Sequence, residues 1–327
     1  MSRIHVLTLL LAALCCAPAH AVSFDWAAVG NPGNAGEWSG ESHGGYGPDA
    51  IVGGVNYNYR ISKHEVNAGQ YTEFLNAVAA SDPHGLYSTE MWSNQYGCKI
   101  ERLGTDGSYV YSMAADRENR PVNFVSFLDA MRFTNWLENG QGSGGTESGV
   151  YTISDGLSEV RNPDATYFIP SEDEWYKAAY HKNDGVTSNY FDFPTSSDNW
   201  SSNDLVDPDP GNNANFFQFG GYTIGSPYYL TNVGEFENSE SPYGTFDQGG
   251  NVWEWNEELY ASSSRGLRGG GWGNSSSLGM KASTREFINQ AYEEGHIGFR
   301  VATVPEPTTP ALIALGLCLV PARRRRA

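Results

Sequence analysis

The chain has 327 residues, and its 38 acidic residues outnumber 20 lysines and arginines to give a formal net charge of −18. A surface this acidic repels nucleic acid and anionic lipid, and it attracts divalent cations. The composition therefore excludes a nucleic-acid partner and a general affinity for membrane surfaces.

Residues 1–21 have the pattern of a secretory signal peptide. Arg3 supplies a positive start, residues 6–16 form an apolar run, and residues 19–21 read Ala-His-Ala, a small-x-small cleavage site. The apolar run is too short for a transmembrane anchor. We expect the mature chain to begin near Val22 and to be exported.

The cysteines predict a body without internal disulfides. Cys15 and Cys16 lie in the signal peptide and Cys318 lies near the C-terminus, so Cys98 is the sole thiol of the body. Stability must then come from packing, hydrogen bonds or metal ions. Aromatic residues make up 13% of the chain, with nine Trp, which favours packing.

The N-terminal third is expected to be irregular at first and then regular. Residues 22–56 are rich in glycine and predict an irregular lead-in, and residues 57–61 predict a strand. A helix should begin after Asn67, because Gln70 is placed to complete a reciprocal cap. The apolar face of this helix comprises Tyr71, Phe74, Leu75 and Val78.

Two further helices have start signals of the same kind. Ser126 and Asp129 open one helix, and Ser171 and Glu174 open the other as a capping box. Their apolar stripes comprise Ala130, Phe133 and Leu137 in the first and Trp175, Ala178 and Ala179 in the second. The sequence after His181 is rich in Gly, Asn, Ser, Tyr and Pro, which predicts loops and short strands. We expect one α+β domain with few regular elements and long ordered loops.

Five segments stand in a fixed order along this body. Residues 61–66 read Ile-Ser-Lys-His-Glu-Val. Residues 121–130 read Pro-Val-Asn-Phe-Val-Ser-Phe-Leu-Asp-Ala, with Trp-Leu at 136–137. Residues 167–175 read Tyr-Phe-Ile-Pro-Ser-Glu-Asp-Glu-Trp, with Ala-Ala at 178–179.

The fourth and fifth segments complete the set. Residues 243–255 read Tyr-Gly-Thr-Phe-Asp-Gln-Gly-Gly-Asn-Val-Trp-Glu-Trp, and the closing part has Leu-Arg-Gly-Gly-Gly-Trp at 267–272, Arg285 and Gly-Phe-Arg at 298–300. Together the segments resemble the formylglycine-generating, sulfatase-modifying factor family. The resemblance implies a single C-type-lectin-like domain, which we place at residues 57–303.

Formylglycine-generating members of this family are copper oxidases, and the resemblance implies two cysteines in the closing segment. Soft thiolates suit Cu(I). Here Asn274 stands at the first cysteine position and Gly279 near the second. Copper and formylglycine-generating oxidase chemistry are therefore not expected. An enzyme of altered chemistry, using Asn274, Ser275 and Arg285 as pocket residues, is the alternative.

Other sites gain less support from the sequence. The iron-dependent sulfoxide synthases of the family use clustered histidines, whereas His43, His64, His84, His181 and His296 are scattered here. Residues 255–257 read Trp-Asn-Glu, which is weakly similar to the calcium motif of glycan-binding C-type lectins. No phosphate loop or Ser/His/Asp order stands out.

The resemblance also implies calcium. One site would take the Asp247 side chain, the Gly250 and Val252 carbonyls and the Glu254 carboxylate, which are hard oxygen ligands. In the alternative interpretation Asp247 caps a turn and Glu254 pairs with a closing arginine. A second site would use Asn215 and the Phe216 carbonyl, with further ligands between residues 218 and 229.

Residues 304–327 combine a Val-Pro-Glu-Pro hinge, a short apolar run and four arginines at 323–326. An apolar segment enters a bilayer and clustered arginines resist translocation. This order resembles the PEP-CTERM sorting signal, which an exosortase recognises in Gram-negative bacteria. Loss of Arg3 and the four terminal arginines would leave 15 basic against 38 acidic residues, a net charge of about −23.

Two functions follow as hypotheses. The first is a non-oxidase binding or structural module, exported to the cell envelope or beyond, with an exopolysaccharide or a peptide as ligand. The second is an oxidoreductase of the formylglycine-generating type with altered chemistry.

Overall fold

A computed structural model describes residues 21–153, 159–274 and 276–304. Almost all of the expected signal peptide and almost all of the expected sorting segment lie outside these residues. None of the helices in the described ranges is long and apolar enough to cross a membrane.

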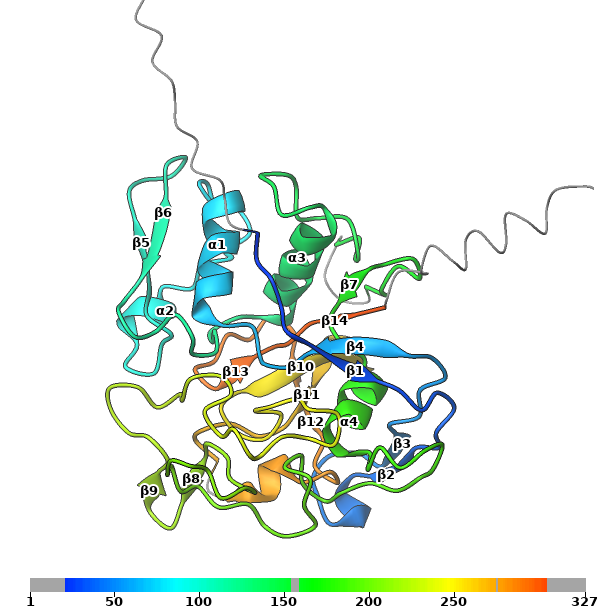
Figure 1. Ribbon diagram of the computed structural model, residues 1–327. Coiled ribbons are helices and arrows are strands. Elements are labelled where there is room, and N and C mark those ends of the chain that lie inside the picture. The colour runs from blue at the N-terminus through cyan, green and yellow to red at the C-terminus, as the bar shows by residue number, and fades with distance from the viewer. Residues whose placement is uncertain (1–20, 154–158, 275, 305–327) are drawn as a thin grey trace, which may run out of the picture.

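All three predicted helices form, and each begins at the predicted cap. The helix α1 (Ala68–Val78) has the Asn67–Gln70 capping box. The helix α3 (Phe127–Glu138) has the Ser126–Asp129 box, and α4 (Glu172–Tyr180) has the Ser171–Glu174 box. Reciprocal side-chain caps satisfy backbone donors at a helix start, so these local signals fix the boundaries. In Figure 1 α1 and α3 stand side by side, with β1, β4 and β10 below them.

The first sheet has the order β1-β4-β14-β7, with β1 at Trp26–Val29, β4 at Tyr59–Ser62, β14 at Ala302–Thr303 and β7 at Tyr167–Phe168. All three strand pairs are antiparallel. The strand β4 begins two residues later than predicted. Residues 22–56 were expected to be an irregular lead-in, but they contain the strand β1. This strand pairs with β4 from Trp26↔Ser62 to Val29↔Tyr59, so the segment that carries β1 packs as part of the domain.

The second sheet has the order β12-β11-β10-β13. Its strands are β10 (Trp253–Tyr260), β11 (Ser264–Arg268), β12 (Glu286–Asn289) and β13 (Ile297–Gly298). The strand β10 pairs antiparallel with β11 and parallel with β13, so the fourth and fifth sequence segments meet at its start.

The remaining elements are short. Three two-stranded ribbons consist of β2 (Glu37–Ser39) with β3 (Ala50–Val52), β5 (Ile100–Leu103) with β6 (Val110–Met113), and β8 (Phe217–Gln218) with β9 (Gly221–Tyr222). The other helices are α2 (Glu90–Ser93), η1 (Glu41–His43) and η2 (Ser277–Met280).

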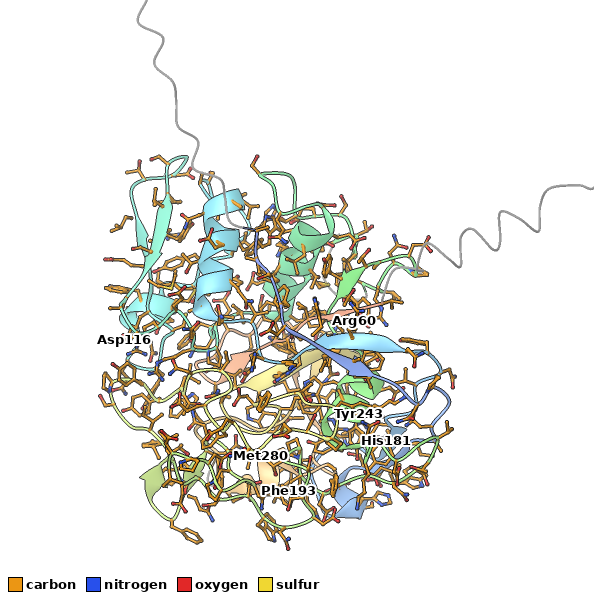
Figure 2. All side chains as sticks on the ribbon, viewed as in Figure 1. Arg60, Asp116, His181, Phe193, Tyr243 and Met280 are labelled. Atoms are coloured by element: carbon orange, nitrogen blue, oxygen red, sulfur yellow. The ribbon has the colours of Figure 1, made fainter. Side chains whose placement is uncertain are left out.

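The main core lies between α1, α3 and the two sheets. Phe74, Phe133 and Trp136 pack edge to face or tilted there, with ring centroids 5.3–5.6 Å apart. Smaller clusters stabilise the loop-rich half. One contains Phe193 and Met280, and His181 lies beside Tyr243 in another part of that half (Figure 2). Aromatic packing thus replaces disulfides in the part of the body that the structure describes.

Candidate functional site

The closing segment turns back on itself at Asn274. Asn274 Oδ1 accepts a hydrogen bond from the Gly271 N–H at 2.7 Å, and the Asn274 N–H donates to the Gly271 carbonyl at 3.0 Å. The Asn274 carbonyl accepts from the Phe217 N–H at 3.0 Å. Asn274 therefore closes a local turn and fastens β8 to the closing segment.

Gly279 lies directly beside Asn274. A Cβ added at Gly279 would lie 2.8 Å from Asn274 Nδ2 and 3.1 Å from its Cγ. Asn274 and Gly279, which the sequence analysis placed at the first and near the second cysteine position, are thus neighbours in space. An amide packed against a glycine fills them here, and neither group is a soft metal ligand.

The other predicted pocket residues do not join Asn274. Ser275 lies outside the described residues. Arg285 is buried, and its Nε and NH2 donate to the two oxygens of Glu172 at 2.8 and 2.6 Å, while NH1 donates to the Pro48 carbonyl. Glu172 also accepts from Arg268, at 2.9 and 2.7 Å. Because each guanidinium is taken up by Glu172 and by carbonyls, this arrangement supports a structural role for Arg285.

Cys98 is the free cysteine of the described chain, and it is buried. Its backbone N–H donates to Asn123 Oδ1 at 2.9 Å, and burial raises the pKa of the thiol to about 11. The thiolate is the form that binds metals and attacks substrates. A thiol held protonated in the core does not substitute for the missing pair.

The predicted calcium loop has its two carboxylates in different settings. Asp247 Oδ2 accepts from the Gly234 N–H at 2.5 Å, and burial raises the pKa of Asp247 to about 7. Glu254 is fully buried and accepts from Trp175 Nε1 at 2.6 Å. It also accepts from Arg300, from Nε at 2.5 Å and from NH2 at 2.6 Å.

The backbone between these carboxylates is tightly held. Gly250 has a φ of +85°, and its N–H donates to the Gly269 carbonyl at 2.9 Å. A Cβ there would lie 2.4 Å from the Asn215 carbonyl oxygen, so glycine is required. Val252 is buried in a small cluster with Leu230 and Trp272.

The side chain of Asn215 has a donor group that is fully used and an oxygen that accepts no hydrogen bond from the described residues. Its Nδ2 donates to the Tyr229 carbonyl at 2.9 Å and to Asn251 Oδ1 at 2.8 Å. Asn215 Oδ1 is buried and has no hydrogen-bond partner among the described residues. The Phe216 carbonyl accepts from Asn203 Nδ2 and Thr223 Oγ1, both at 3.1 Å.

Residues 52–304 match the sulfatase-modifying factor enzyme 1-like domain. The chain belongs to the sulfatase-modifying factor family. No protein with a curated description matches it.

Three solved structures are similar to this chain. CarF is 18% identical, with 87% of this chain and 99% of that chain covered and a TM-score of 0.50. Treponema denticola variable protein 1 is 16% identical, with 88% and 97% covered and a TM-score of 0.52. PvdO from Pseudomonas aeruginosa is 18% identical, with 83% and 92% covered and a TM-score of 0.45. The predicted α+β, C-type-lectin-like fold class is confirmed.

The calcium ligands expected for the sulfatase-modifying factor family fit this chain unevenly. At the Asp247–Glu254 loop, a cation on Glu254 would lie against the Arg300 guanidinium, so the donor set fits poorly. At Asn215 the buried, unpartnered Oδ1 is the kind of hard oxygen that Ca²⁺ takes. The second site therefore fits calcium better than the first.

The structure shows two features of this chain that the sequence did not predict. One is an aromatic group formed by Tyr96, Phe217, Tyr222, Tyr229 and Trp272. The centroid of the Trp272 ring lies 4.7 Å from that of Tyr96, 5.0 Å from that of Tyr229 and 5.7 Å from that of Tyr222. Tyr96 and Trp272 are distant in the sequence from each other and from the three rings at 217–229, so no spacing pattern could show the group. The other feature is the buried carboxylate of Glu65.

Proposed function

We propose that this protein is a non-oxidase binding module that is exported and displayed at the cell envelope. The observation that carries the proposal is the Asn274–Gly279 contact, because amide and glycine occupy the positions where Cu(I) thiolates would be needed. The fold alone does not decide between binding and catalysis.

The aromatic group supports a binding role and suggests where a ligand lies. It adjoins the Asn274 turn through the Phe217 N–H to Asn274 carbonyl hydrogen bond. Tyr222 is 43% exposed, and Tyr96 and Tyr229 are partly exposed, so ring surfaces are open to solvent. Aromatic rings with polar edges combine large contact area with low conformational cost in binding surfaces. The ligand is an exopolysaccharide or a peptide without many negative charges, because the domain is strongly acidic.

Oxidase activity is tested on a sulfatase-type cysteine peptide with added copper. The body from Val22 to Val304 should produce no aldehyde above a control without protein, as measured by mass spectrometry. Aldehyde formation would overturn the proposal and favour the oxidoreductase of altered chemistry.

Binding is tested with a glycan and peptide array. Retention of the wild type should be reduced by Tyr222→Ala, which removes an exposed ring of the aromatic group. Tyr260→Ala is the matched control, because Tyr260 is 50% exposed and lies at the far end of β10. Equal retention of both variants would place the ligand elsewhere.

Export and calcium complete the proposal. The C-terminal segment would pass the chain to an exosortase, which gives an envelope or extracellular location. Calcium would use Asn215 Oδ1 and the Phe216 carbonyl, and once bound it would stabilise the folded state by mass action. These two neutral oxygens are hard ligands, which suit Ca²⁺ and do not suit Cu(I).

A further inference from the structure

Glu65 is a buried acid without a hydrogen-bond partner. It follows β4 in the link to α1, where the neighbouring Val66 N–H donates to the Phe299 carbonyl at 2.9 Å. The Glu65 residue is 2% exposed, and neither carboxylate oxygen has a partner within the described chain. An unpaired buried carboxylate is costly, and either a proton or a bound cation relieves that cost.

The charges around Glu65 do not balance. Burial, with the charges of Asp247 and Glu254, raises the pKa of Glu65 well above its usual value. Arg300 is the guanidinium that faces these acids, and Glu254 already takes two of its hydrogen bonds. Three acids thus share one arginine.

His64 does not supply the missing charge. Burial, together with the nearby Arg300, lowers the pKa of His64 to about 4. Its ring stacks on Phe246 with centroids 5.5 Å apart, and the Phe246 N–H donates to the Lys63 carbonyl at 2.7 Å. These contacts hold the Glu65 segment against the segment that carries Asp247.

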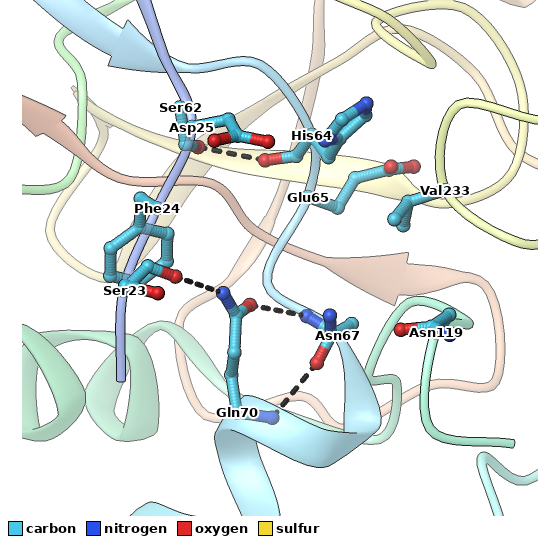
Figure 3. A pocket seen from close by; sticks show the side chains of 10 residues that line it. All are labelled: Ser23, Phe24, Asp25, Ser62, His64, Glu65, Asn67, Gln70, Asn119 and Val233. Carbon is cyan, nitrogen blue, oxygen red and sulfur yellow. Dashed lines mark hydrogen bonds between the residues drawn. The ribbon is translucent and has the colours of Figure 1, made fainter. Parts of the chain in front are cut away.

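A cavity of about 260 Å³ lies beside Glu65. Its lining includes Glu65 together with the oxygen-bearing residues Asp25, Ser62, Asn67 and Asn119. Figure 3 shows the Glu65 carboxyl group extending toward Val233 at one side of this lining. Carboxylate, hydroxyl and amide oxygens are the ligands that hard divalent cations prefer.

We propose that Glu65 ligates a hard divalent cation, Ca²⁺ by preference, that enters through this cavity. A charge of +2 offsets the excess of acids over Arg300. Ca²⁺ accepts irregular sets of six to eight oxygens, whereas Mg²⁺ demands a near-ideal octahedron.

The site proposed at Glu65 is distinct from the calcium site expected at the Asp247–Glu254 loop, because a different carboxylate would bind the cation. Glu254 is committed to Arg300 and Trp175, whereas both Glu65 oxygens are free to ligate. No three His, Cys, Asp or Glu side chains converge at ligand distance in the ranges the structure covers. Neutral oxygens and water must complete the shell, which places the dissociation constant at about 0.1–1 mM, as in extracellular modules.

The test counts bound calcium by isothermal titration in the chelator-treated wild type and in Glu65→Gln. The variant should lose one equivalent of Ca²⁺. It should also lose the part of the calcium-induced rise in unfolding midpoint that this ion supplies, about 2–3 °C at ten times the dissociation constant. Glu240→Gln, at an exposed position, is the control and should keep the wild-type number of bound Ca²⁺ ions and the wild-type rise in midpoint.

Folding and the second site are controlled separately. Metal-free Glu65→Gln should unfold near the wild-type midpoint, because Gln keeps the size of Glu and the carboxyl group that it replaces has no hydrogen bond to lose. Asn215→Ala removes the other candidate ligand, so it should leave the Glu65 equivalent in place. Equal calcium stoichiometry in the wild type and Glu65→Gln, zero included, would overturn the proposal.

Discussion

Arg300 and Glu254 form a two-point contact in the fully buried centre of the domain, with Nε to Oε2 at 2.5 Å and NH2 to Oε1 at 2.6 Å. The guanidinium also donates to the carbonyls of Ser62, Lys63 and Phe246. Trp175 Nε1 donates to the same carboxylate. One ion pair therefore joins β4, α4, β10 and the closing segment.

Arg300→Met should destabilise the domain strongly. The substitution leaves Glu254 buried without its charged partner, and breaking such a pair costs about 3–5 kcal/mol. Arg60→Met, at an exposed position of β4, should change the free energy of unfolding by about 0.5 kcal/mol or less. Urea unfolding measures both. A loss in Arg300→Met no larger than in the control would show that the ion pair contributes little.

The stability of the domain should depend on pH through Asp129. Burial raises the pKa of Asp129 from 3.8 to about 7, so the folded state binds a proton that the unfolded state releases. Asp129 therefore lowers the free energy of unfolding by up to about 4 kcal/mol as pH rises from about 4 to 7. Above pH 7 its contribution does not change further. The difference in unfolding free energy between wild type and Asp129→Asn should follow this course. A difference independent of pH would contradict it.

Helix starts were predictable because their signals are local. The caps at Asn67, Ser126 and Ser171 need only residues three positions apart, and all three form. The pairing of β1 with β4 was not predictable, because a four-residue strand in a Gly-rich segment is defined by its partner.

The site was predictable only in outline. The order of segments located the closing turn and the positions 274 and 279, but the commitment of Arg285 to Glu172 depends on contacts across 113 residues. Glu65 lacks any local pattern. Its role follows from Asp247, Glu254 and Arg300, which are distant in the sequence and are brought together by the fold.

The Asn274→Cys/Gly279→Cys double variant should bind one Cu(I). The two positions are adjacent, and replacing Asn274 removes the Nδ2 that would crowd a side chain at 279. Two thiolates suit Cu(I). Competition with a chromophoric Cu(I) chelator under reducing conditions measures the affinity. Each single variant is the control and should bind far more weakly. Equal affinity in singles and double would show that the positions cannot share an ion.

Gly250→Ala should cost more than about 3 kcal/mol of unfolding free energy. Alanine is strained at a φ of +85°, and its Cβ would overlap the Asn215 carbonyl. Gly225→Ala is the control, because a Cβ there meets nothing within 4 Å. Thermal unfolding compares the two. Similar unfolding midpoints for the two variants would mean that the Asp247–Glu254 loop moves easily to accommodate the added methyl group.

Deletion of residues 323–326 should leave the precursor unprocessed or mislocalised. In the sorting signal that we propose, the four arginines are the part expected to resist translocation. Their replacement by four lysines keeps the charge and should preserve processing. Immunoblots of cell fractions distinguish the outcomes, and normal processing of the deletion would count against the sorting signal.

The sheet order β1-β4-β14-β7 has a consequence for the timing of folding. Its strand β14 comes from the last described residues yet lies between β4 and β7, and the Ser62 N–H donates to the Val301 carbonyl. During synthesis or passage through a translocon, β4 must wait for more than about 200 residues before its neighbour emerges, and such distant contacts slow folding. The first sheet can thus close only after its strand from the end of the domain is available. Under the export that we propose, a chain that is still threading would lack this strand and stay unfolded.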